Sequence, residues 1–100
     1  MVTLTELGFR AMLCAMKRGK VSMTAPLQAR LNKQKAAIYG EANELLTAQD
    51  KPSEHIPDYT EQEEEAVDVL IASLTYLGLC GIDIDGAVEA KMNFNETREK

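Results

Sequence analysis

Two short segments each place a pair of carboxylates inside a stretch that otherwise favours buried helix. The first pair is Glu41 and Glu44, and the second is Glu65 and Asp68. Residues three apart on an α-helix project from neighbouring turns of one face, so the two members of each pair point the same way. If the two helices pack together, four carboxylates can meet. The fold must therefore accommodate a concentrated negative charge.

Glu41 is the most informative of the four because it lies within an apolar helical stripe rather than opposite it. The stripe consists of Leu27, Leu31, Ile38 and Leu45. A charge on a core-facing stripe is costly unless it is paired, hydrogen-bonded or bound to a cation. Asp68 stands in a similar relation to Ile71, and neither acidic segment contains Lys or Arg. A divalent metal explains this economically, and oxygen ligands alone favour Mg2+ or Mn2+ over zinc.

Length and composition indicate a single all-α domain over residues 1–100. Ala, Leu, Glu, Lys, Gln and Met dominate, and Pro occurs at three positions, which is typical of helical proteins. A chain of 100 residues builds a small core, so burying more surface by oligomerising would stabilise it. The net charge of −5 argues against a nucleic-acid partner, because phosphate contacts normally need a basic patch. It is compatible with a small charged ligand that arrives as its metal complex.

The cysteines and the first residues favour a cytoplasmic protein. Cys14 and Cys80 lack metal-ligand spacing and lie in apolar helical contexts, so we expect buried free thiols in a reducing compartment, with a disulfide as the alternative. Residues 1–16 lack a basic start and a small-residue cleavage site. The sequence therefore predicts neither an export signal nor a membrane span, and no membrane partner.

Capping and breaking signals predict two helices in the first half of the chain. Thr3 and Glu6 form a capping-box pattern that opens a helix to about residue 17, and Gly19 ends it. Thr24 as N-cap, with Pro26 in the first turn, opens a second helix to about residue 48.

Two further helices are expected in the second half. Thr60 and Glu63 form another capping box, and Gly81 closes the helix that follows. Its expected apolar face consists of Val67, Leu70, Ile71, Leu74 and Leu77. Asp83 caps a last helix that runs to the C-terminus.

Several polar residues outside the acidic segments are candidates for ligand contacts. His55 lies in an expected loop over residues 50–59 and could be a general base or metal ligand, although a lone loop histidine is more often just exposed. Arg30, Lys33 and Lys35 could contact phosphate or form a solvated face. Lys91, Asn95 and Arg98 share one face of the last helix, suited either to phosphate oxygens or to pairing with glutamates.

The motifs together resemble the MazG family of all-α nucleoside triphosphate pyrophosphohydrolases. Their order is Glu-x-x-Glu, a gap of twenty residues, Glu-x-x-Asp, an apolar helix, Gly-Ile-Asp and then Lys-x-x-x-Asn-x-x-Arg. The family signature is E-E-x-x-E followed after a variable gap by E-x-x-D, and the match covers residues 35–98, most of the chain. One departure is visible, since Gly40 replaces the first glutamate of the signature.

The resemblance implies a fold, an assembly and a site. It implies a four-helix protomer whose helical bundle is completed by dimerisation, in a homodimer or homotetramer, with the active site built from both protomers. By position, the carboxylates that would hold Mg2+ against a triphosphate are Glu41, Glu44, Glu65 and Asp68. The residues that would contact phosphate or sugar are Lys91, Asn95 and Arg98.

The implied reaction is hydrolysis of a ribo- or deoxynucleoside triphosphate to the monophosphate and pyrophosphate, for example to clean the nucleotide pool. Glu41 or Glu44 would orient or deprotonate the water that attacks the α-phosphorus, and the metal would lower the pKa of that water. One alternative is phosphoribosyl-ATP pyrophosphohydrolase, which belongs to the same superfamily. Another is a helical dimerisation module without catalytic activity, whose acidic faces are only solvated.

Overall fold

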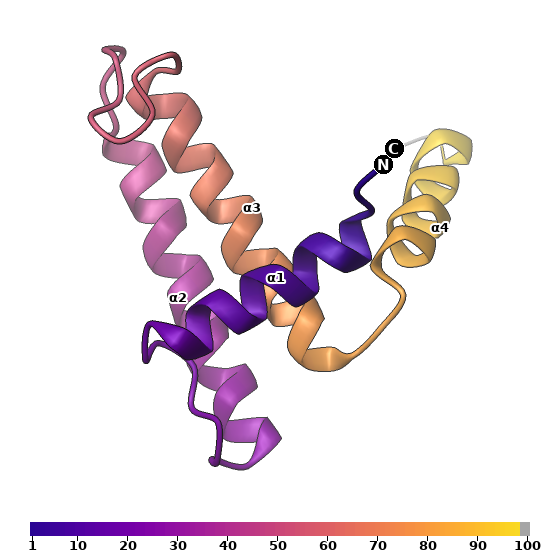
Figure 1. Ribbon diagram of the computed structural model, residues 1–100. Coiled ribbons are helices and arrows are strands. Elements are labelled where there is room, and N and C mark those ends of the chain that lie inside the picture. The colour runs from indigo at the N-terminus through magenta and orange to yellow at the C-terminus, as the bar shows by residue number, and fades with distance from the viewer. Residues whose placement is uncertain (99–100) are drawn as a thin grey trace.

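The structure is a computed structural model that describes residues 1–98, and it is all-α as predicted. Its four helices are α1 (Leu4–Lys17), α2 (Leu27–Thr47), α3 (Glu61–Cys80) and α4 (Ile84–Thr97). The helices α2 and α3 form an antiparallel hairpin, α1 crosses α3, and α4 stands apart on the far side of α1 (Figure 1). Within residues 1–98 no single helix is long and apolar enough to cross a membrane. Taken together, α3 and α4 have the length and the apolar composition of a membrane span, but the pair is bent by 114°.

The expected helix ends are confirmed with two exceptions, one of which is that α4 ends at Thr97, with Arg98 as an extended C-cap, and does not run to the C-terminus. Thr60 and Glu63 form a complete capping box at the start of α3, Asp83 caps α4, and Gly81 ends α3 at φ 69° in the left-handed region. Thr24 is not the N-cap of α2, because Pro26 occupies that position without a side-chain cap. Residues 22–25 instead form a turn in which the Ser22 hydroxyl accepts from the backbone N–H groups of residues 24 and 25.

The helices α1 and α3 approach closely through two glycines. A Cβ at Gly78 would lie 2.6 Å from the carbonyl oxygen of Gly8, and a Cβ at Gly8 would collide with the Ile84 side chain. Because neither residue has a side chain, the two backbones can come together at this crossing. Ile84 lies beneath the crossing and is only 1% exposed. The crossing therefore fixes where the C-terminal end of α1 lies over the α2–α3 hairpin.

The predicted apolar face of α3 is only partly buried. Leu74 is buried, but Val67, Leu70 and Ile71 are exposed. The buried positions of α3 are instead Ala72, Leu74, Thr75 and Leu79. The reason is that α1 and α2 cover two sides of α3 and no element of the described chain covers a third. The expectation of buried cysteines is also wrong, since Cys14 and Cys80 are free but exposed.

A reciprocal cap attaches α4 to α1. The Asp85 carboxylate accepts hydrogen bonds from the backbone N–H groups of Leu4 and Thr5 at 2.9 and 3.0 Å and from the Thr5 hydroxyl at 2.7 Å. In return, the Thr5 hydroxyl oxygen accepts from the backbone N–H of Ile84 at 3.0 Å. The start of each helix thus satisfies orphan N–H groups at the start of the other.

The single chain is open. Its accessible surface is 7354 Å², whereas a compact monomer of 11.0 kDa would expose roughly 5600 Å². Its radius of gyration is 15.0 Å, against about 13 Å for a compact domain of this length. The excess surface comes from the arm formed by α4 and from the uncovered side of α3 (Figure 1).

Candidate metal centre

The hairpin brings three of the four predicted carboxylates together. Glu41 and Glu44 from α2 and Glu65 from α3 each offer an oxygen, and these oxygens all lie within 4.8 Å of one another. We call these three residues the acid cluster. Asp68 does not belong to this close set, but it is half-buried one turn further along α3 and lines a groove together with Glu41.

Two oxygens of the acid cluster are buried without a partner. In the described part of the chain, Oε2 of Glu41 and Oε2 of Glu65 accept no hydrogen bond, although neither is reached by solvent. Buried polar atoms without a partner are rare in folded proteins and call for a specific explanation. A cation held by carboxylate oxygens alone is one, and this donor set suits a hard ion such as Mg2+ or Mn2+. The residues therefore fit the expected metal.

The acids destabilise one another in their ionised forms. Burial raises the pKa of Glu41, and the charges of Glu44 and Asp68 raise it further. Burial also raises the pKa of Glu65, again with contributions from Asp68 and Glu44. The pKa of Asp68 is raised first by burial and then by the charges of Glu64 and Glu44. Each shift has the direction expected of carboxylates whose burial and mutual repulsion outweigh the attraction of nearby cations.

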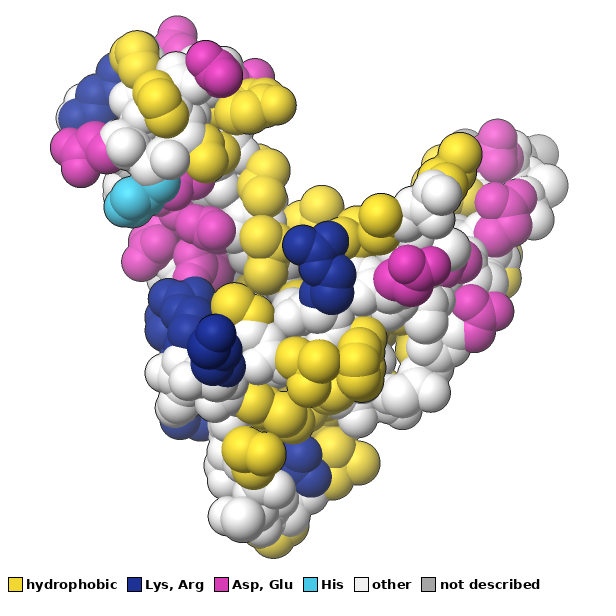
Figure 2. Space-filling view, in the orientation of Figure 1, with side chains coloured by type: hydrophobic (Ala, Val, Ile, Leu, Met, Phe, Trp, Pro, Cys, Tyr) yellow, Lys and Arg dark blue, Asp and Glu magenta, His cyan; other side chains and the backbone are white. Residues whose placement is uncertain are grey.

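Two cations that belong to none of the sequence motifs lie near the acids. Lys20 acts to lower the pKa of Glu41, and Arg18 acts to lower that of Asp68. Both come from the turn after α1, where Gly19 adopts φ 73°. On the face shown in Figure 2, Lys and Arg side chains lie directly beside a patch of acidic ones. The only signal in the sequence was a pair of cations flanking a glycine that ends a helix.

The other predicted cations have different surroundings. Lys33 lines the groove next to Glu41, whereas the Arg30 side chain donates to the backbone carbonyl of Ala25. Lys35 is exposed.

The predicted phosphate contacts of α4 do not meet the acid cluster within one chain. Lys91, Asn95 and Arg98 are all exposed, but only Lys91 and Asn95 lie on the helix, since Arg98 is its extended C-cap. The Lys91 ammonium and the Arg98 guanidinium lie 4.6 and 5.6 Å from the centre of the Phe94 ring, a cation–π arrangement. Because α4 packs on the start of α1, these residues lie far from the middle of α2 (Figure 1).

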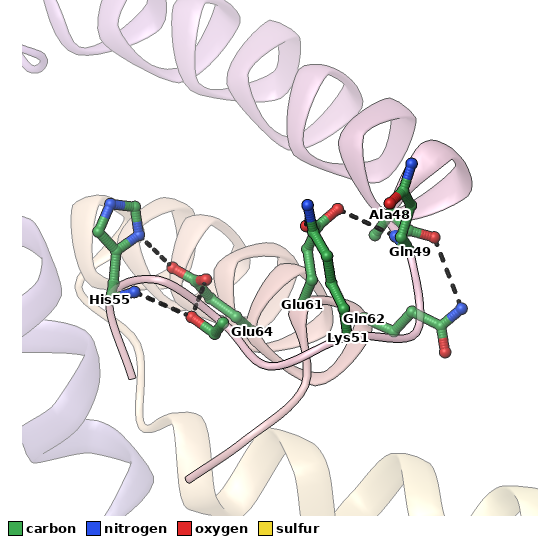
Figure 3. A network of polar contacts seen from close by, with 8 residues as sticks. Ala48, Gln49, Lys51, His55, Glu61, Gln62 and Glu64 are labelled. Atoms are coloured by element: carbon green, nitrogen blue, oxygen red, sulfur yellow. Dashed lines mark hydrogen bonds and ion pairs between the residues drawn. The ribbon is translucent and has the colours of Figure 1, made fainter. Parts of the chain in front are cut away.

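His55 lies in the loop between α2 and α3 and contacts Glu64 rather than the acid cluster (Figure 3). Its Nδ1 lies 2.8 Å from Oε2 of Glu64, and its ring is largely exposed. The hydrogen bond to Glu64 raises the pKa of His55, while hydrogen bonds from Ser53 and His55 lower that of Glu64. Ser53 is buried, and its oxygen also accepts from the backbone N–H groups of His55 and Ile56. These contacts order the loop.

Comparisons of the chain with protein-family models, with curated proteins and with solved structures found no match.

Proposed function

We propose that the protein is a Mg2+-dependent nucleoside triphosphate pyrophosphohydrolase of MazG type, which releases nucleoside monophosphate and pyrophosphate. The observation that carries the proposal is the acid cluster, with buried unpartnered oxygens on Glu41 and Glu65. A solvated acidic face leaves the two buried, unpartnered oxygens unexplained, whereas a bound cation would give each of them a partner. The sequence resemblance supplies the reaction, and the geometry of the acid cluster supports the proposal of a metal at these residues.

Each acidic residue has a role in this proposal. Glu41, Glu44 and Glu65 would hold the metal, and Asp68 would complete the ligand set. Bound Mg2+, or Mn2+, supplies charge neutralisation for the triphosphate and a more acidic water. Glu41 or Glu44 orients the water that attacks the α-phosphorus, or accepts its proton.

Arg18 and Lys20 add a contribution that the resemblance did not include. Both are exposed side chains beside the acids, and they can contact phosphate oxygens on the solvent side of the acid cluster. Such contacts stabilise the negative charge that the reaction moves to the leaving pyrophosphate.

The active form in this proposal is a homodimer, or a tetramer built from it. Large apolar side chains that a monomer would bury are exposed on α3 and α4, namely Val67, Leu70, Val88, Met92 and Phe94. A standard interface buries about 800 Å² per partner, and the open chain exposes more excess surface than that. Dimerisation would also let α4 of one copy bring Lys91, Asn95 and Arg98 to the acid cluster of the other. The substrates are cytoplasmic, and we place the protein there.

The direct test is an assay of the purified protein with standard and damaged ribo- and deoxynucleoside triphosphates, with and without Mg2+. Pyrophosphate and nucleoside monophosphate should appear in equal amounts and only with the metal. Glu65→Gln should abolish the activity. Glu89→Gln changes an exposed acid on α4 and should leave it unchanged.

Three results would oppose the proposal. Release of inorganic phosphate instead of pyrophosphate would show that the protein cleaves the terminal phosphoanhydride bond and not the bond at the α-phosphorus. Cleavage of phosphoribosyl-ATP alone would move the protein to the alternative pyrophosphohydrolase. If nothing is cleaved and Mg2+ does not bind, the acids are structural and the protein is a dimerisation module.

A further inference from the structure

A groove leads away from the acid cluster between α1, α2 and α3. Its volume is about 600 Å³, within the range of small-molecule sites. Glu41 and Asp68 line it at one end. Gln34 precedes Glu41 by seven residues on α2, and Thr75 follows Asp68 by seven on α3. Because the helices are antiparallel, both residues lie in the same direction from the acids, about 10 Å away.

Gln34 is a polar residue at a position where α2 should be apolar. With Leu31 and Ile38 it continues the stripe that also contains Glu41, and it is only 7% exposed. Its Nε2 donates to the backbone carbonyl of Ala72 at 2.9 Å. A carbonyl oxygen can only accept, so this contact fixes which way the amide points. Among the described residues no donor reaches the Oε1 of Gln34, and its side chain lines the groove.

Thr75 adds a second acceptor at the same end of the groove. It is 3% exposed, and its hydroxyl donates to the backbone carbonyl of Ile71 at 2.9 Å. Since the hydroxyl hydrogen of Thr75 is already used in this hydrogen bond, its oxygen can only accept a hydrogen bond from a ligand. The inner end of the groove therefore presents two acceptors, Gln34 Oε1 and Thr75 Oγ1. Small side chains also line the groove, including Ala11, Ala37 and Ala72, so little of its space is taken up by the walls.

We propose that the groove binds the nucleoside part of the substrate, and that Gln34 and Thr75 select bases carrying an exocyclic amino group. An amino group offers two N–H donors to the two acceptors, whereas a carbonyl at the same ring position would face them as a third acceptor and leave all of them unpaired. Cytosine is therefore preferred over uracil, and adenine over hypoxanthine. The identity of the ligand as a nucleotide rests on the proposed function.

The two ends of the groove fit the two ends of a nucleotide. The acid cluster, Arg18 and Lys20 lie where the phosphates and their metal would be, and the acceptors lie about two helical turns away. That separation is roughly the length of a nucleoside. One substrate can therefore reach both ends at once.

The test uses two pairs of product nucleotides that differ only in amino against oxo, CMP with UMP and AMP with IMP. Binding is measured by calorimetry on the intact protein with Mg2+ present, and because a monophosphate is not cleaved, the readout does not depend on catalysis. We expect the amino member of at least one pair to bind about tenfold or more tightly. Gln34→Met keeps the volume but removes the acceptor, and should bring the ratio close to one.

Matched variants separate base selection from folding. Gln28→Met makes the same change at an exposed position of α2 and should preserve the ratio. Thr75→Val removes the second acceptor at constant shape and should lower the ratio even if Gln34→Met fails to fold. Equal binding of amino and oxo members by the unaltered protein would overturn the inference, as would a preference that survives in both variants.

The assay for pyrophosphate distinguishes this inference from the proposed function. If no triphosphate is cleaved but an amino preference is present and is lost in Gln34→Met, the groove is a nucleotide site and the catalytic proposal is wrong. If CTP and UTP, and ATP and ITP, are cleaved with equal kcat/KM, the catalytic proposal stands and the selection by Gln34 and Thr75 is wrong.

Discussion

Glu41 is a half-buried carboxylate among other carboxylates, so its ionised form opposes folding. Its pKa is raised by folding, and the native state therefore holds the proton up to a higher pH than the unfolded chain. The destabilisation is absent below the unfolded pKa, about 4.3, and is complete above the folded one. Without divalent metal, Glu41→Gln should thus unfold at a higher temperature than the parent at pH 7. This advantage should shrink as the pH falls towards 4.

Magnesium should make the parent more stable to heat than Glu41→Gln, which reverses their order of stability without metal. At a concentration one hundred times its Kd, Mg2+ stabilises the parent by about 2.7 kcal/mol, and most of that gain should be lost in Glu41→Gln. Thermal unfolding with and without Mg2+ measures both effects, with Glu89→Gln as the exposed control. If Mg2+ shifts the parent and Glu41→Gln by equal amounts, Glu41 is not a ligand.

The sequence identified the residues of the acid cluster but missed its neighbours. Glu41 was recognisable because a charge interrupts an apolar stripe, and that conflict can be seen without a structure. Gln34 interrupts the same stripe, but an amide carries no charge, so its position is a weaker sign of a functional site. Arg18 and Lys20 lie more than twenty residues from Glu41 in the chain. Only the crossing of α1 over the hairpin brings them close, and no local pattern encodes that crossing.

The crossing of α1 and α3 depends on glycine at a position where helices normally prefer alanine. Gly78→Ala would force a Cβ to within 2.6 Å of the Gly8 carbonyl oxygen, and the helices would have to separate. We expect a loss of about 1–3 kcal/mol, typical of overpacking, and a fall in Tm of about 4–8 °C for each kcal/mol.

Gly40→Ala is the matched control, because it makes the same change within a helix and no atom beyond its chain neighbours and the local helix backbone lies within 4 Å of the new Cβ. It should raise stability by about 0.5–1 kcal/mol through helix propensity. Denaturant unfolding of both variants at one protein concentration gives the comparison. A gain in stability for both would show that α1 and α3 do not pack through their glycines.

Asp85 joins two helices whose starts are eighty residues apart in the sequence. Hydrogen bonds from Thr5 and Leu4 lower its pKa, so its contribution is present above the unfolded pKa and is lost as the pH falls through the folded one. Asp85→Asn should lower the Tm at pH 7, and the difference from the parent should vanish in acid. Glu89→Gln on the same helix should show no such pH-dependent difference.

Helices were easier to predict than their faces. Capping residues such as Thr60, Asp83 and Gly81 act within one turn, so their effects can be read locally. The exposed positions Val67 and Leu70 were predicted to be buried because they lie on an apolar stripe, but burial requires a second element, and the described chain provides none there. The proposed dimer would supply the missing element.

At the level of the whole molecule, the open shape separates two sets of residues that the proposed reaction needs together. The acid cluster lies in the hairpin, and Lys91 lies on the α4 arm beyond α1 (Figure 1). In the proposed twofold dimer, α4 of each copy would contact the hairpin of the other, and this contact would cover the exposed apolar side chains of α4 and α3.

Mixing two inactive variants tests this arrangement. Glu65→Gln disables the acid cluster, and Lys91→Ala disables the α4 contact. If α4 acts across the interface, a mixed dimer has one site with both defects and one site with none. Random reassembly of equal amounts after dissociation should then restore about a quarter of the parent activity. If α4 acts within its own chain, every site in the mixture keeps one defect and no activity returns, so the two arrangements give opposite results in a single assay.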